Sequence, residues 1–382
     1  MKKILFPAFA AVMAFASCSK EDNGARIPGT KTVEISINSG STSRAAGTAI
    51  NGVGTENDIN AWVAFAQSST DGLYVAAHAS TSAGKATFTS VPVGSVVYVI
   101  ANATPANLAT ALPADGATGI SLATIEGIVE NVVKTQLNTK SNLLNSTPGN
   151  PSVAQMLMTG SGVVLNSPMD NAAGETDKVK LTISLEREYA KVNFTARATP
   201  GTNVTAVGGT INSIDEISVH RVVNRVSPFK TQSAEWYIPK SPYVADASVN
   251  AGTPAAGASD LVFKYTQTGT GDKTQRFYTT PNYSALDAYA TTVIVKATIT
   301  ANFGPDANFT NAERYYRAFV YDTDIAAEKG ITLKNTIYNI TAIINGPGEG
   351  TEEEALENDN VDLNIYVEAK YWNVRTTTVN ME

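Results

Sequence analysis

The sequence predicts a mainly β protein with two antiparallel β-sandwich domains and one or two short helices in the N-terminal domain. From residue 58 onward, short runs of β-branched and aromatic residues recur, separated by Gly, Pro, Ser or Asp, as is typical of antiparallel sandwiches. Neither half shows the regular alternation of strand and helix that a parallel sheet requires. The 382 residues, of which 43% are hydrophobic, suffice for two ordinary cores.

The first half begins with the run KTVEISINSG, in which Val33, Ile35 and Ile37 alternate with polar residues. This period of two predicts a half-buried strand. Further strands are expected at 58–67, 73–79, 85–91, 95–102, 156–160 and 178–188. Between them, apolar residues recur at helical spacing from 122 to 137, which predicts one amphipathic helix packed on or beside the sheet.

The second half is predicted to be another all-β sandwich. Its strands are expected at 189–198, 211–223, 233–239, 261–265, 275–280, 290–300, 313–321, 335–346, 361–369 and 371–379. Because one strand run ends near Glu188 and the next begins almost at once, we place the domain boundary there. The predicted domains are therefore 45–188 and 189–382.

The N-terminus has the pattern of a secretory signal. Two lysines precede an apolar run that is too short to span a bilayer, and small residues lead to Cys18, the only cysteine. This pattern resembles a bacterial lipobox, which predicts a signal peptide at 1–17 and lipidation of Cys18. The alternative is an incidental cysteine near an ordinary cleavage site. A single cysteine excludes an internal disulfide.

A loop of small residues, STSRAAG at 41–47, follows the first predicted strand. Such loops are readily nicked by proteases. A cut between Arg44 and Ala45 would release residues 18–44, including the strand and the lipidation site. A cut at Arg26 would only shorten the tether, because Arg26 precedes the strand. The alternative is that Arg44 is an incidental loop arginine.

Signals for catalysis, metals and cofactors are weak. The two histidines, His78 and His220, each lie inside a predicted strand without a second histidine nearby, which favours a structural role. No common catalytic motif is present, so we expect no enzyme activity, cofactor or metal site. A hydrolase with paired carboxylates remains open. The acidic run 349–359 lacks the spacing of a calcium loop and is interpreted as a solvated hairpin tip. A net charge of −7 and a pI of about 5.1 argue against nucleic acid as a partner.

Several segments, in their order along the chain, resemble the fimbrillins of Bacteroidales type V pili. They are the lipobox at Cys18, the arginine loop at Arg44, Met158-Thr159-Gly160, Leu185-Glu186-Arg187, Ala190-Lys191-Val192 and Asn335 to Ile340. The resemblance implies two sandwiches of transthyretin-like or Greek-key type and a palmitoylated outer-membrane lipoprotein precursor. It also implies a surface protease specific for arginine, strand exchange between stalk, tip and anchor subunits, and a fimbria that supports adhesion and biofilm formation through host or bacterial surface ligands.

The resemblance implies a donor strand near the C-terminus, and residues 361–382 offer two runs. In the first, Val361, Leu363, Ile365 and Val367 share one face. In the second, which is the candidate donor strand, the shared face holds Trp372, Val374, Thr376 and Thr378. The alternative is an ordinary sheet edge. We therefore expect a structural pilin, with a non-polymerising, glycan-binding surface lipoprotein as the alternative function.

Overall fold

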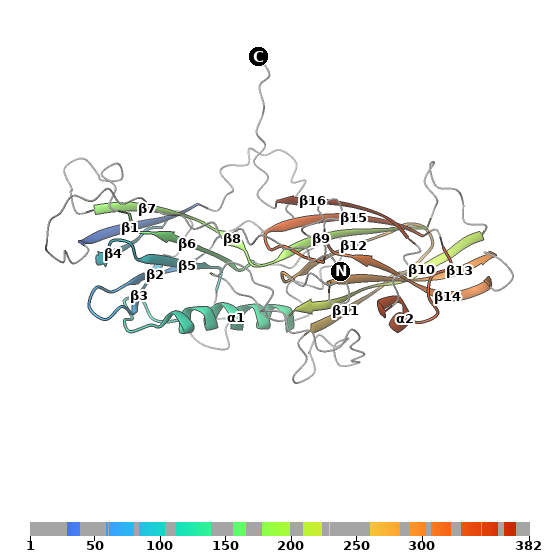
Figure 1. Cartoon of the computed structure of the whole chain (residues 1–382), viewed down its shortest axis with the longest axis horizontal. Helices are drawn as coiled ribbons and strands as arrows, with labels where there is room; N and C mark the ends of the chain where they lie inside the picture. The colour runs from blue at the N-terminus through green and yellow to red at the C-terminus, as the bar shows by residue number, and fades with distance from the viewer. Residues whose placement is uncertain are drawn as a thin grey trace, which may run out of the picture.

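The structure is a computed structural model. It describes residues 29–38, 59, 61–79, 84–103, 112–138, 156–165, 178–198, 209–223, 229, 260–282, 290–302, 307–321, 330–344, 346–357 and 363–371. Figure 1 shows an elongated molecule in which an N-terminal half and a C-terminal half follow one another along the long axis. The mainly-β sandwich class expected from the sequence is confirmed.

Two sheets build the N-terminal half. The plug sheet has the order β4-β1-β7, and the middle sheet has the order β3-β2-β5-β6-β8. Their strands are β1 (Thr30–Asn38), β2 (Trp62–Gln67), β3 (Tyr74–Ala79), β4 (Ala86–Pro92), β5 (Val96–Ala101), β6 (Met158–Val163), β7 (Lys178–Ser184) and β8 (Glu186–Arg187).

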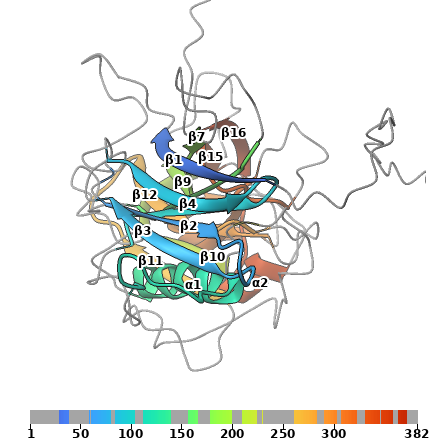
Figure 2. The same cartoon turned by 90° about the vertical axis from the view of Figure 1, so that its left-hand side faces the viewer.

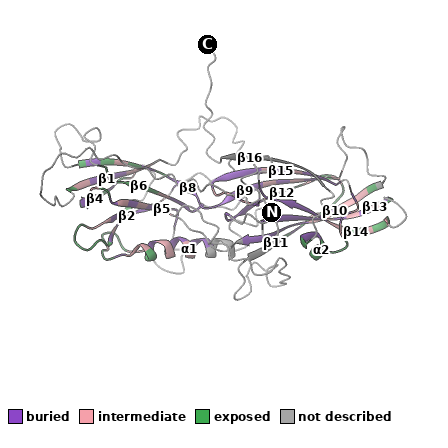
Figure 3. Cartoon of the chain, viewed as in Figure 1, coloured by how far each residue is buried: buried purple, intermediate pink, exposed green. Residues whose placement is uncertain are grey.

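The middle sheet is covered on both faces, so this half has three layers. Figure 2 shows β1 and β4 above β2 and β3, with helix α1 (Leu122–Asn138) beneath them. Strand β2 illustrates the consequence, because Trp62 and Ala64 pack toward the plug sheet whereas Val63 and Phe65 belong to the cluster that includes α1. Successive residues of β2, which point to opposite faces of the sheet, are therefore both buried, and Figure 3 shows this strand as largely buried.

Helix α1 lies where the periodicity predicted it. Its apolar face, with Ile125, Val129 and Val132 fully buried, packs in the same cluster as the middle sheet. The Ser121 hydroxyl accepts a hydrogen bond from the Thr124 backbone N–H at 3.1 Å, which caps the first turn. The other described helix, α2 (Glu352–Glu357), belongs to the C-terminal half rather than to the N-terminal one.

Two glycines bring the sheets of the N-terminal half close together. A Cβ atom at Gly160 of β6 would lie 2.4 Å from the carbonyl oxygen of Ser184, and one at Gly162 would lie 3.2 Å from the Ile183 and Leu181 side chains. Only glycine leaves room for this approach at position 160. The MTG segment quoted for the resemblance thus has a packing role.

The C-terminal half is a sandwich of two four-stranded sheets, ordered β12-β9-β15-β16 and β11-β10-β13-β14. Their strands are β9 (Ala190–Arg197), β10 (Gly209–Val223), β11 (Asp260–Thr266), β12 (Lys273–Thr279), β13 (Thr292–Asn302), β14 (Asn308–Phe319), β15 (Thr336–Ile344) and β16 (Leu363–Tyr371). Alternate residues such as Ile217, Val219, Val293 and Val295 fill the space between the sheets. Helix α2 packs on the outer face of the second sheet through Ala355, Leu356 and Ile294.

Most strand pairs are antiparallel, but two are parallel. Strand β1 runs parallel to β7, and β15 runs parallel to β9. Each parallel pair joins strands far apart in the sequence, so the connections pass through other elements rather than through a hairpin. The sequence expectation of antiparallel sandwiches therefore holds for the sheets as a whole and not for these two pairs.

Buried polar residues join the two halves. The chain leaves the middle sheet at Arg187 and enters the next sheet at Ala190. Between them, Glu188 accepts a hydrogen bond from Thr159 and lies 3.3 Å from the Lys334 ammonium. Burial raises the pKa of Glu188, against the opposing effect of Lys334 and Thr159. Because one hydrophobic cluster also contains residues of both halves, the junction is a packed interface and not a loose linker.

Candidate assembly groove

Strand β1 is the central strand of the plug sheet. It pairs with β4 on one side, from Thr30 opposite Pro92 to Ile35 opposite Ala86. On the other side, Thr32 to Asn38 pair in parallel register with Lys178 to Ser184 of β7. In the described part of the sheet, β4 and β7 each pair with no strand other than β1. The position of β1 therefore holds the two flanking strands together.

The inward face of β1 carries the apolar residues that the alternation predicted. Val33 and Ile35 are fully buried, and Ile37 is partly buried in the same cluster. They belong to one hydrophobic cluster with residues of both sheets, referred to as the lining, which includes Phe88, Val91, Ile183, Trp62, Val97, Val99 and Met158. Full burial of such a side chain contributes roughly 1.5–3 kcal/mol. Departure of β1 would expose this lining and two unpaired strand edges, which together form the assembly groove.

The outward face of β1 carries one acid among lysines. The Glu34 carboxylate lies 2.7 Å from the Lys85 ammonium, which precedes β4. Glu34 also pairs in register with Lys180 of β7. The hydrogen bond from Lys85 lowers the pKa of Glu34 against the opposing effect of desolvation, and the charges of Lys85, Lys180 and Lys178 lower it further. Lys85 and Lys180 are named the lysine collar below.

A strap of residues 346–357 is fixed to the outer face of the second C-terminal sheet. Glu349 forms an antiparallel bridge with Tyr315, and Arg314 donates hydrogen bonds to the carbonyls of Pro347 and Gly348. Thr351 and Glu354 form a capping box, since the Glu354 N–H bonds the Thr351 hydroxyl at 3.1 Å and the Thr351 N–H bonds the Glu354 carboxylate at 3.0 Å. Helix α2 thus starts at a defined residue.

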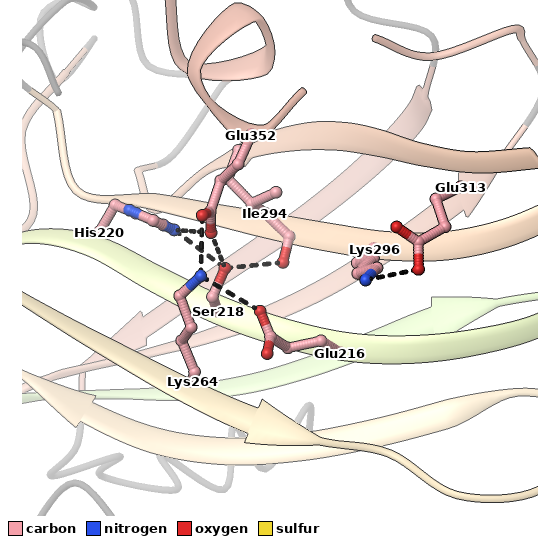
Figure 4. A network of polar contacts seen from close by, with 8 residues as sticks. All are labelled: Glu216, Ser218, His220, Lys264, Ile294, Lys296, Glu313 and Glu352. Atoms are coloured by element: carbon pink, nitrogen blue, oxygen red, sulfur yellow. Dashed lines mark hydrogen bonds and ion pairs between the residues drawn. The ribbon is translucent and has the colours of Figure 1, made fainter. Parts of the chain in front are cut away.

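Charged side chains of the sheet hold both ends of α2. Near its start, the Glu352 carboxylate lies 2.8 Å from the Lys264 ammonium and 3.0 Å from His220 Nε2, as Figure 4 shows. At its other end, the Leu356 carbonyl accepts hydrogen bonds from Arg221 at 3.1 Å and Arg317 at 3.0 Å. Residues 352–357 lie in the connection between the antiparallel strands β15 and β16, and Glu353, Glu354 and Glu357 are exposed, as expected of a solvated hairpin tip. Glu352 is the exception, because Lys264 and His220 of other strands contact its carboxylate.

The arrangement of Ser218, His220 and Glu352 is structural rather than hydrolytic. Both the Ser218 hydroxyl and the Glu352 carboxylate contact the same imidazole nitrogen, Nε2, whereas a hydrolase triad uses one nitrogen for each. Nδ1 is buried with no hydrogen-bond partner among the described residues. Burial lowers the pKa of His220, so the ring is neutral at pH 7 and its Nε2–H donates to Glu352.

Glu352→Gln is expected to weaken the folded state at neutral pH and to have little effect in acid. Burial alone would raise the pKa of Glu352, but His220 and Lys264 together lower it to about 2, from an ordinary value of 4.5. The ion pair therefore stabilises the protein above about pH 4.5, and this stabilisation is lost as the pH falls toward 2. Urea unfolding at pH 7 should show a loss on the order of 1–3 kcal/mol.

The control is Glu353→Gln, which changes the exposed neighbour on the same helix. It should alter stability by less than about 0.5 kcal/mol. Equal losses for the two variants, or a loss for Glu352→Gln that is as large at pH 2 as at pH 7, would contradict the assigned ion pair.

The structure describes only part of the predicted site. Val33, Ile35 and Ile37 lie together on the inward face of β1. Cys18, Arg44, Ala45 and the second C-terminal run, with Trp372, Val374, Thr376 and Thr378, lie outside the described residues. No group of three or more acids, histidines or cysteines within the described ranges is placed to hold a metal ion. None of the described helices is long and apolar enough to cross a membrane.

Segments singled out in the sequence meet at the junction of the halves. Thr159 bonds Glu188, and the buried Arg187 guanidinium bonds Asn335 at 3.2 Å. Sequence reasoning missed the lysine collar and the strap. A signal existed for each: the spacing of Lys178 and Lys180 on one strand face, and the pattern Thr351-x-x-Glu354 of a capping box.

The chain is similar to known proteins in structure but not in sequence. No protein-family model matches the chain, and no curated protein matches it by sequence. Solved structures match over nearly the whole chain. Fimbrilin FimA from Porphyromonas gingivalis matches with a TM-score of 0.51 and 15% identity, over 91% of this chain and 98% of that one. The chain has the fold of Bacteroidales fimbrial proteins.

Two further structures share this fimbrial fold. One, assigned to cell adhesion in Bacteroides eggerthii, matches with a TM-score of 0.51 and 18% identity, over 91% of this chain and 98% of that one. Another, assigned to cell adhesion in Parabacteroides distasonis, matches with a TM-score of 0.50 and 16% identity, over 90% of this chain and all of that one. The fimbrial fold therefore extends across both halves of the chain.

Proposed function

We propose that the chain is a structural subunit of a cell-surface fimbria that polymerises by strand exchange. The observation that carries this proposal is the central place of β1, whose departure opens a groove between two strands. An open groove with unpaired backbone edges is a template for a strand of another chain. The fimbrial fold supports the same function.

Export and maturation complete the proposal. The precursor is an outer-membrane lipoprotein anchored through Cys18, and an arginine-specific surface protease cuts between Arg44 and Ala45. Because β1 precedes Arg44 in the sequence, one cut separates both the strand and the lipid from the rest of the chain. The C-terminal region 361–382 of another copy then fills the groove. A cut site together with a C-terminal strand favours a stalk subunit, with tip and anchor subunits as further partners.

The test is the state of the protein on the cell surface. Protein purified from surfaces should begin at Ala45 and run as a ladder of oligomers on an unheated denaturing gel. A chain that begins at acylated Cys18 and runs as one monomer band would overturn the proposal. That outcome would favour the alternative of a non-polymerising, glycan-binding surface lipoprotein.

A further inference from the structure

We propose that residues 358–366 of a neighbouring copy fill the assembly groove, with Asp362 in the place of Glu34 against Lys85 and Lys180. This inference rests on the proposed function and adds to it the register of the entering strand. It selects the first of the two C-terminal runs, rather than Trp372 to Thr378, as the segment that replaces β1.

The two lysines on the outward side of the groove favour an entering strand that carries an acidic residue there. In the precursor, Glu34 lies 2.7 Å from the Lys85 ammonium and opposite Lys180 in the parallel register. Departure of β1 removes that carboxylate from the collar. A strand that enters the groove therefore restores the same electrostatic balance only if it carries an acid at the position of Glu34.

The first C-terminal run repeats the pattern of β1 position by position. Val33-Glu34-Ile35-Ser36-Ile37 corresponds to Val361-Asp362-Leu363-Asn364-Ile365, so the inward residues are aliphatic and the outward ones are an acid and a small polar residue. Both strands thus present the same two faces to the groove.

The other registers fit less well. The second run, Trp372 to Thr376, has no acid on its outward face and places Arg375 there. A shift of the first run that brings Glu368 to the collar would place Ala369 at the fully buried site of Ile35. The smaller side chain would leave a cavity, which destabilises a packed core.

The strap determines where the entering segment starts. Hydrogen bonds from Arg221 and Arg317 to the Leu356 carbonyl fix the end of α2 on the sheet, so a C-terminal arm can leave the subunit only after Glu357. Figure 1 places α2 in the part of the C-terminal half that lies away from the N-terminal half. An arm that starts here extends from one end of the molecule, as head-to-tail assembly requires.

A tail that starts after β16 would leave from the middle of the molecule instead. Strand β16 pairs with β15 from Leu363 opposite Ile344 to Tyr371 opposite Thr336. Thr336 adjoins Asn335, whose backbone N–H bonds the Tyr189 carbonyl at the junction of the halves. Strand β16 therefore ends, at Tyr371, beside the junction of the halves.

Backbone pairing favours the exchange. In the described sheet, β16 is an edge strand with β15 as its one neighbour. In the groove, residues 358–366 would pair with β4 on one side and β7 on the other, as β1 does. Residues 363–366 of this segment would give up one strand neighbour, β15, and gain two.

Reversing the charges on the entering strand and on the groove tests the proposed register of the strand. Full-length chains are cut with an arginine-specific protease and the oligomers are measured on unheated denaturing gels. Asp362→Lys should reduce the oligomer fraction by about tenfold or more, because it sets a cation against the collar. Combining Asp362→Lys with Lys85→Glu, Lys180→Glu and Glu34→Lys should restore the ladder, since both the precursor and the assembled contact are then complementary.

Glu368→Lys is the matched control, because it makes the same change of charge six residues later in the sequence and should leave the ladder intact. Thermal unfolding of each uncut variant verifies that it folds. A ladder that is unaffected by Asp362→Lys, or is lost with Glu368→Lys alone, would overturn the register. If the wild-type chain forms no ladder, the proposed function fails and this inference fails with it.

A crosslink gives a second readout. The Ser36 and Thr182 hydroxyls lie 3.1 Å apart across β1 and β7, and Asn364 would take the place of Ser36. A chain with both Asn364→Cys and Thr182→Cys should form disulfide-linked oligomers after the cut, which removes the native Cys18. If instead the pair Arg375→Cys and Thr182→Cys crosslinks, the second C-terminal run occupies the groove and the inference is wrong.

Discussion

Arg44→Ala is expected to abolish assembly and to leave a monomeric, lipidated precursor on the cell surface. Without the cut, β1 remains covalently attached and stays in the groove, where Val33 and Ile35 are fully buried. The entering strand would have to displace an intramolecular competitor whose effective concentration is on the order of millimolar. Oligomers on unheated gels should fall at least a hundredfold relative to wild type, and the N-terminus should be acylated Cys18.

Arg26→Ala is the control for this result. Because Arg26 precedes β1 in the sequence, its loss should change neither the mature N-terminus at Ala45 nor the ladder. If the Arg44→Ala variant assembles as well as the wild-type chain, release of β1 does not require this cut. Loss of assembly by Arg26→Ala would place the essential cut before the strand.

Ile35→Asp is expected to destabilise the uncut precursor by on the order of 4 kcal/mol or more, because it removes a buried aliphatic side chain and places a carboxyl group in an apolar lining. The residue is fully buried between the plug sheet and the middle sheet. Urea unfolding of the full-length precursor measures the loss, and poor accumulation of folded protein would be a consistent result.

Ser36→Asp is the matched control, since it introduces the same side chain at the next residue. Ser36 lies on the outward face, where its hydroxyl contacts Thr182, and an aspartate there can remain hydrated. The expected change is below about 1 kcal/mol. If the two variants lose similar stability, the alternation of faces assigned to β1 is incorrect.

Much of the fold could be predicted because strand and helix periods appear in a sequence without knowledge of partners. The alternation at Val33 and Ile35 and the helical spacing in α1 are local patterns, and both elements lie where these patterns placed them. Strand direction could not be predicted in the same way. The parallel pairing of β1 with β7 joins residues 146 positions apart, as Ser36 and Thr182 do, and backbone hydrogen bonds carry no side-chain signature.

The acidic run shows the second limit. Read alone, Glu352 to Glu354 suggest a solvated segment. In the folded chain, Lys264 and His220 face Glu352, while Arg221 and Arg317 hold the other end of α2. The sequence cannot reveal these contacts, because the four side chains come from β10, β11 and β14. The pattern Thr351-x-x-Glu354 was the one local signal for the helix.

The sequence by itself determined that residues 33–37 form a strand with one apolar face, because that property depends only on a period of two. It also placed Arg44 just beyond this strand and a similar apolar pattern near the C-terminus. Only the tertiary structure decided that β1 is a central strand, that its outward acid faces Lys85 and Lys180, and that α2 is held on the outer face of the second C-terminal sheet. These features depend on contacts between distant segments, which form only when burial brings the sheets together.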